Sequence, residues 1–128
     1  MTVPKKKILV IDDSSTNVVL LDTIFSMKGY AIQTAISANE AFAIIKRGLP
    51  AIILLDLNMP EISGFEFLEQ LKENEKTRSI PVLIVSAMVD KYSYDRAMSL
   101  GAYGYINKPV DIPVLLDKVS EILDALLK

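Results

Sequence analysis

Short apolar runs alternate with helical patterns along this chain. Three runs are continuous in apolar residues, which is typical of strands that are buried on both faces. They cover residues 8–11, 51–55 and 82–85. A weaker run covers residues 103–106, and residues 30–35 have the mixed polarity expected of a strand near the edge of a sheet.

Helical patterns fill the segments between these runs, and several have readable ends. The apolar positions of residues 18–27 stop before Gly29, which suits a left-handed cap at the helix end. Ser37 and Glu40 have the spacing of a capping box, and that helix is expected to end at Gly48. The pattern predicts three further helices, over residues 64–74, 90–100 and 114–127.

The alternation of strands and helices predicts the fold class. Strand–helix–strand units give a parallel sheet with right-handed crossovers. Five strands and five helices in 128 residues therefore indicate one α/β domain over residues 1–128, a doubly wound sheet without linkers or repeats. Ligands of such folds bind at the carboxyl ends of the strands, so the residues that follow each strand are the candidates for function.

Composition narrows the chemistry. Hydrophobic residues make up 51% of the chain and charged residues 23%, a globular balance. The absence of Cys and His excludes disulfides, zinc–thiolate sites, and cysteine or histidine catalysis by this chain. A net charge of −2 argues against direct nucleic-acid binding. The longest apolar run is far shorter than the ~20 residues of a membrane span, so we expect a soluble, cytoplasmic protein without membrane insertion.

Polar side chains follow four of the predicted strands. Each has a structural explanation by itself, because an Asp after a strand often caps the next helix. Together they place complementary chemistry at one edge of the sheet, which favours a functional site. The residues are Asp12, Asp13, Asp56, Ser86 and Lys108.

The chemistry of this set points to phosphoryl transfer. Three neighbouring carboxylates repel one another unless a cation lies among them, and oxygen ligands favour Mg²⁺, with Mn²⁺ as the alternative. A carboxylate beside such an ion can attack a phosphoryl group and form an acyl phosphate. Lys108 would neutralise one phosphoryl oxygen and Ser86 would donate to another. We therefore predict a phosphorylatable aspartate.

With these motifs the sequence resembles the response-regulator receiver domains, the CheY-like family of two-component signalling. The similarity covers residues 6–127 and implies a flavodoxin-like fold with strand order 2-1-3-4-5. The matching elements, in order, are Asp12-Asp13, Asp56, Asn58-Met59-Pro60, Gly64, Ser86-Ala87, Tyr105 and Lys108-Pro109.

The resemblance implies a role for each acidic residue. Asp56 would accept the phosphoryl group from a sensor histidine kinase or a histidine phosphotransfer protein. Asp13, Asp56 and the backbone carbonyl of Asn58 would bind Mg²⁺ directly, and Asp12 would act through a coordinated water.

The resemblance also implies a conformational switch. Lys108 would contact the phosphoryl group, Ser86 would move toward it, and Tyr105 would change rotamer as Ser86 moves. The alternative for Tyr105 is a core aromatic that never switches. Pro109 matches a cis proline of the family, and Met88 is apolar where many relatives are polar, which bears on the lifetime of the phosphoaspartate.

The expected function is a phosphorylation-activated switch that alters its face for an output domain or target protein, and not an enzyme with turnover. The alternative is a receiver-like interaction module that acts without phosphorylation. A haloacid-dehalogenase-type phosphatase would need a second Asp where this chain has Asn58. A flavodoxin would need a phosphate loop where Asp12 and Asp13 would repel the phosphate.

The last helix allows two interpretations. Leu115, Val119, Ile122 and Leu126 form a row at 4-3-4 spacing. We favour a helix that packs on the sheet. The alternative is a helix that continues as a linker in a larger regulator, or that supports a homodimer through the last helices.

Overall fold

The computed structural model describes residues 6–126, which form five strands and five helices in strict alternation. All strand pairs are parallel, in the order β2-β1-β3-β4-β5, so the predicted fold class and strand order are confirmed. The elements are β1 (Lys7–Ile11), α1 (Ser15–Met27), β2 (Ala31–Ala35), α2 (Ala38–Arg47), β3 (Ile52–Leu55), α3 (Gly64–Glu73), β4 (Val82–Ser86), α4 (Lys91–Ser99), β5 (Gly104–Asn107) and α5 (Ile112–Ala125).

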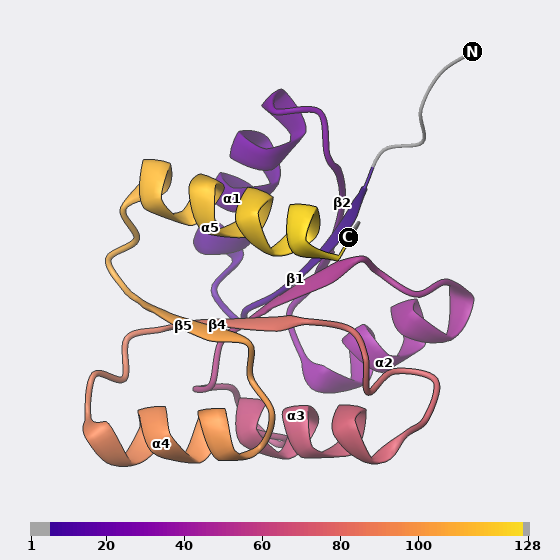
Figure 1. The fold of residues 1–128 in the computed structure, drawn as a ribbon, viewed down its shortest axis with the longest axis vertical. Coiled ribbons are helices and arrows are strands. Elements are labelled where there is room, and N and C mark those ends of the chain that lie inside the picture. Colours follow the sequence, from indigo (N-terminus) through magenta and orange to yellow (C-terminus); the bar gives the residue numbers. More distant parts are fainter. Residues whose placement is uncertain (1–5, 127–128) are drawn as a thin grey trace.

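Helices cover the sheet on both faces (Figure 1): α1 and α5 lie on one side, and α2, α3 and α4 on the other. Alternate side chains of β1 enter different cores, because Leu9 and Ile11 pack with α2–α4 whereas Ile8 and Val10 pack with α1 and α5. This double burial explains the continuous apolar runs. The edge strand β2 is only half-buried over its first four residues, as its mixed polarity predicts.

Side-chain caps define where the helices begin. Helix α1 begins three residues before the predicted start, because the Ser14 hydroxyl accepts a hydrogen bond from the backbone of Asn17. Helix α5 begins two residues early, after the Asp111 cap. The predicted caps at Ser37 and Asp90 are confirmed, with backbone donors at 3.1 and 2.9 Å.

Two boundaries at the C-terminal end of the chain differ from their predictions. Strand β5 begins one residue later than the apolar run suggested. Helix α5 ends at Ala125, and Leu127, which we predicted to be helical, lies outside the described residues.

The apolar row of α5 packs on the sheet. Leu115, Val119 and Ile122 are fully buried, whereas Leu126 is 52% exposed. Three of the four positions are therefore buried inside the domain, which confirms that the helix packs on the sheet. A continuation into a larger regulator and a homodimer through the last helices stay predictions.

Within residues 6–126, none of the helices combines the length and apolar character that crossing a membrane requires.

Candidate functional site

The carboxyl ends of the strands meet at one edge of the sheet, on the left of Figure 1. Asp12 follows β1 and Asp56 follows β3, and both are buried, with 3% and 6% of their surfaces exposed. Asp13 is exposed. One carboxylate oxygen from each of the three lies within 4.8 Å of the others. The structure thus brings the three predicted carboxylates together, although Asp13 faces solvent.

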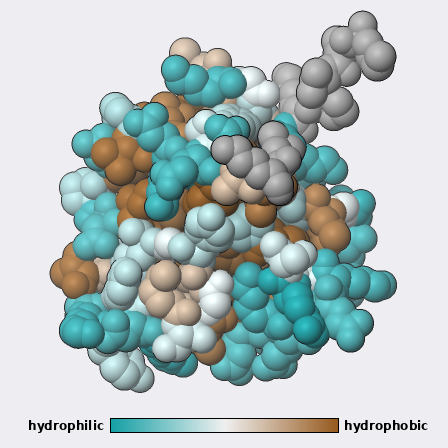
Figure 2. All heavy atoms as spheres, viewed as in Figure 1, coloured by the Kyte–Doolittle hydropathy of each residue, from teal (hydrophilic) through white to brown (hydrophobic). Residues whose placement is uncertain are grey.

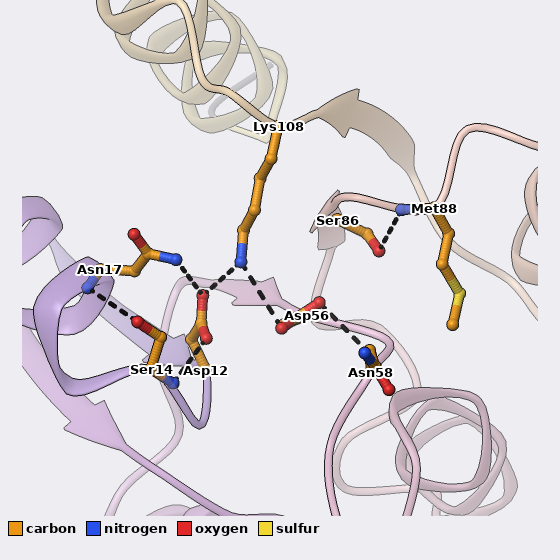
Figure 3. Close-up of polar contacts among 8 residues, drawn as sticks. All are labelled: Asp12, Ser14, Asn17, Asp56, Asn58, Ser86, Met88 and Lys108. Carbon is orange, nitrogen blue, oxygen red and sulfur yellow. Dashed lines mark hydrogen bonds and ion pairs between the residues drawn. The ribbon is translucent and has the colours of Figure 1, made fainter.

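Lys108 reaches into this group from the loop after β5 (Figure 3). Its Nζ lies 2.7 Å from Oδ2 of Asp12 and 3.5 Å from Oδ2 of Asp56. The backbone N–H of Lys108 donates to the carbonyl of Ser86 at 2.9 Å, which ties this loop to the end of β4. The peptide bond to Pro109 is cis, as the resemblance implied.

Backbone donors hold the two buried carboxylates. The N–H of Ser14 donates to Oδ1 of Asp12 at 2.9 Å, and the N–H of Asn58 donates to Oδ1 of Asp56 at 3.3 Å. The use of the Asn58 carbonyl as a metal ligand stays a prediction.

Electrostatics perturb the central pair. Burial raises the pKa of Asp56, and the charge of Asp12 adds to this rise, while Lys108 and the N–H of Asn58 oppose it. Burial lowers the pKa of Lys108, but Asp12 and Asp56 outweigh burial, so its pKa is raised and the side chain stays charged. Three carboxylates against one ammonium leave two excess negative charges, which a divalent cation bound by oxygen ligands would balance.

Asp56→Asn is expected to stabilise the metal-free fold at pH 7, because it removes a buried negative charge that also faces Asp12. Because the folded-state pKa of Asp56 is raised above 3.8, its ionised form destabilises the fold at neutral pH. As the pH falls through the raised pKa, the folded protein gains a proton before the unfolded chain does, so the advantage of the variant shrinks. Urea unfolding of both proteins between pH 7 and pH 4 without Mg²⁺ measures this. A gap that widens toward acid would contradict it.

Gly64 allows α3 to begin against the backbone beside Asp56. A Cβ at this position would overlap the carbonyl oxygen of Asp56 and would lie 2.5 Å from Cα of Leu57. The N–H of Gly64 donates to the carbonyl of Leu57 at 3.0 Å. The family resemblance includes a glycine at this position, but only the structure explains why a side chain does not fit there. The start of α3 and the backbone of Asp56 and Leu57 lie too close together.

We expect Gly64→Ala to cost about 1–3 kcal/mol of stability, because the overlap is with backbone atoms that cannot move aside easily. Gly48→Ala is the matched control, since among residues 6–126 a Cβ there would meet Nζ of Lys7 alone, the end of a flexible side chain, at 3.2 Å. Urea unfolding of both variants gives the comparison. Equal stability of the two would mean that the backbone beside Asp56 yields without cost.

A chain of hydrogen bonds links β4 and β5 beside the acidic residues. The hydroxyl of Ser86 accepts from the N–H of Met88 at 3.1 Å, and Oη of Tyr105 donates to the carbonyl of Met88 at 2.6 Å. Within residues 6–126 no hydrogen bond joins Ser86 to Asp56. The backbone of Met88 therefore connects the two predicted switch residues, a link that its sequence position does not reveal.

Sequence reasoning also missed Asn17. Its Nδ2 donates to Oδ2 of Asp12 at 3.4 Å. The only signal in the sequence is a polar residue five positions after Asp12, on a helix whose other nearby residues, such as Leu20 and Leu21, are apolar.

A doubly wound α/β domain with three carboxylates and a lysine at the carboxyl edge of its sheet defines the class of protein, a flavodoxin-like domain with an acidic site. Residues 8–120 match the family model of the response regulator receiver domain. The chain belongs to this family, and the predicted resemblance is confirmed. It is therefore a receiver domain of two-component signalling.

Similar proteins differ in how much of their length this chain spans. It is 35% identical over 116 residues to the response regulator PleD of Caulobacter vibrioides, covering 91% of this chain but only 26% of PleD. It is 30% identical to the polar-differentiation response regulator DivK of Brucella ovis, covering 92% of this chain and 96% of DivK. The chain thus spans about a quarter of one relative and nearly all of the other.

Solved structures of receiver proteins share the fold. The chemotaxis protein CheY4 of Vibrio cholerae superposes with a TM-score of 0.88 at 25% identity, covering 93% of this chain and 99% of that one. A CheY-like receiver domain protein from Methanospirillum hungatei gives a TM-score of 0.89 at 28% identity, covering 95% and 96%.

Proposed function

We propose that this domain is a switch that accepts a phosphoryl group on Asp56 from a phosphohistidine of a sensor kinase or phosphotransfer protein. The observation that carries the proposal is the position of Asp56, a buried carboxylate that directly follows β3 and lies beside Lys108 and two further carboxylates. Buried carboxylates with a raised pKa and a cationic neighbour are typical of functional sites.

The proposed reaction is a transfer between two acceptors. A carboxylate oxygen of Asp56 attacks phosphorus, and the P–N bond of the phosphohistidine breaks with its electron pair going to the imidazole nitrogen. Lys108, which contacts Asp56 at 3.5 Å, would offset charge on the phosphoryl oxygens. Asp13, Asp56 and the carbonyl of Asn58 would hold Mg²⁺, with Asp12 acting through water, and the bound ion would offset further phosphoryl charge.

The proposed switch uses the link between β4 and β5. Movement of the Ser86 hydroxyl toward a phosphoryl group would break its hydrogen bond with Met88, whose carbonyl also holds Tyr105. The change would reach the surface of α4, β5 and α5, where Tyr92, Tyr94 and Tyr103 are exposed. We propose that this face binds an output domain or target protein.

Some charged residues of that face serve the fold. The Arg96 guanidinium lies 4.3 Å above the ring of Phe65, and Asp111 caps α5. We therefore expect the exposed tyrosines, and not these two charged side chains, to provide the contacts with a target.

Intact mass after incubation with acetyl phosphate tests the proposal. We expect one phosphoryl adduct that depends on Mg²⁺. Mass is the suitable readout because the chain has no Trp for a quenching assay. If neither acetyl phosphate nor a phosphorylated kinase gives an adduct, the interaction module without phosphorylation becomes the better account.

A protein donor must cover the rim of the acidic site to bring its phosphohistidine to Asp56. Lys108 and Asn17 border a mainly apolar cavity of about 270 Å³, whose other lining residues include Leu20, Leu21, Val110 and Ile112. Leu20 is 49% exposed. Figure 2 shows that hydrophobic residues are exposed near the start of α5, on a surface that is otherwise largely hydrophilic. We propose that the donor protein contacts the apolar residues around this cavity, Leu20, Leu21, Val110 and Ile112, which we call the apolar rim.

Leu20→Asp is expected to slow phosphoryl transfer from a protein donor about tenfold or more, because a charge would have to be buried against the donor. Transfer from acetyl phosphate is expected to stay unchanged, since a small donor does not need the rim. Gel assays with a phosphorylated phosphotransfer protein and mass spectra with acetyl phosphate give the two rates. Equal slowing with both donors would assign the effect to the site itself.

A further inference from the structure

Asn17 lies in the first turn of α1, and its side chain points toward the acidic site (Figure 3). Its Nδ2 donates to Oδ2 of Asp12 at 3.4 Å, and Nζ of Lys108 donates to the same oxygen at 2.7 Å. The backbone of Ser14 holds the other oxygen. Asp12 therefore has one donor from the Ser14 cap that precedes α1, one from α1 itself, and one from the distant loop after β5.

We infer that Asn17 is a positioning residue that keeps Asp12 oriented when Lys108 turns from Asp12 toward a phosphoryl group. The inference rests on the proposed function, in which Lys108 serves both partners. Lys108 has a flexible stem and a single ammonium group. When that group moves, Oδ2 of Asp12 loses its charged donor, and a side chain that is only 5% exposed is costly to leave without one.

The position of Asn17 on the helix suits this task. Because α1 packs on the sheet through Val18 and Leu21, the amide is carried by a fixed element, unlike the ammonium of Lys108. The cap of α1 does not need the amide, since the Ser14 hydroxyl receives the backbone N–H of Asn17. Asn is also a weaker helix former than Leu, so helix stability gives no reason for its presence.

The test compares Mg²⁺ affinities without any phosphodonor, by following backbone amide NMR shifts of the acidic residues. Asn17→Leu removes the donor and keeps the backbone cap. We expect Mg²⁺ binding to weaken about fivefold, the effect of one hydrogen bond on the orientation of a carboxylate near a metal. Asn17→Gln keeps a donor and is expected to restore most of the affinity. Thr16→Val, an exposed neighbour in the same turn, is expected to change nothing.

Repeating the substitutions in the Lys108→Ala variant distinguishes an effect on the orientation of Asp12 from a general effect on packing. In Lys108→Ala, Asn17 becomes the only side chain known to donate to Oδ2 of Asp12 among residues 6–126, so the loss caused by Asn17→Leu is expected to grow to about tenfold. Equal affinity of Asn17→Leu and the unsubstituted chain would overturn the inference. So would a loss that Asn17→Gln does not repair and that is the same in both backgrounds. No Mg²⁺ response in the unsubstituted chain would instead overturn the proposed function.

Discussion

Asp56→Asn is expected to take up no phosphoryl group from acetyl phosphate under conditions that give the unsubstituted domain one Mg²⁺-dependent adduct. The amide keeps the shape of the side chain but replaces the nucleophilic carboxylate with a neutral group. Because the raised pKa of Asp56 already costs stability at pH 7, the variant is expected to remain folded. Loss of labelling would therefore report chemistry and not unfolding.

Asp124→Asn is the control for this experiment. It makes the same chemical change at an exposed carboxylate of α5 and is expected to label like the unsubstituted domain. Intact mass gives the stoichiometry for all three proteins. Labelling of Asp56→Asn at full stoichiometry would sink the assignment of Asp56 and direct attention to Asp12 or Asp13, which lie within reach of the same donor.

Lys108→Ala is expected to bind Mg²⁺ but to lose nearly all of the conformational response to phosphorylation. Its ammonium is the one positive charge that contacts both Asp12 and Asp56 among the described side chains. Without it, charge on a phosphoryl group would no longer pull the loop after β5 toward the site. The backbone bond from residue 108 to the carbonyl of Ser86 is kept in the variant, so the loop itself is expected to stay in place.

The measurement is the change in amide NMR shifts at Met88 and Tyr105 when the phosphodonor is added, at matched levels of phosphorylation by intact mass. Lys46→Ala, at an exposed position of α2, is the control and is expected to respond fully. A full response of Lys108→Ala would remove Lys108 from the switch, while leaving Asp56 as the acceptor.

Hydrophobic pattern was sufficient to predict the fold because the pattern reflects burial. Strands β1, β3 and β4 are buried on both faces and read as continuous apolar runs, whereas β2 at the edge does not. The predicted helix starts were wrong where the cap precedes the apolar pattern. Helix α1 begins after its Ser14 cap, three residues before the first apolar position of the pattern. The family then supplied the strand order, which the residues alone leave open.

The sequence by itself also determined that Asp12, Asp56 and Lys108 share one edge, because parallel strands end on the same side of a sheet. It could not determine which atoms meet. Lys108 lies nearer to Asp12 than to Asp56. These two contacts join residues that are 96 and 52 positions apart in the sequence, respectively, so local spacing does not predict them.

The spacing of residues in the sequence also does not predict which neighbouring groups hold the site residues in place. The amide of Asn17 beside Asp12, the overlap that excludes a side chain at Gly64, and the Met88 carbonyl that receives Tyr105 follow from how α1, α3 and β5 pack on the sheet. Periodicity specifies which face of an element is buried, and only the packed structure specifies which neighbour each buried atom contacts.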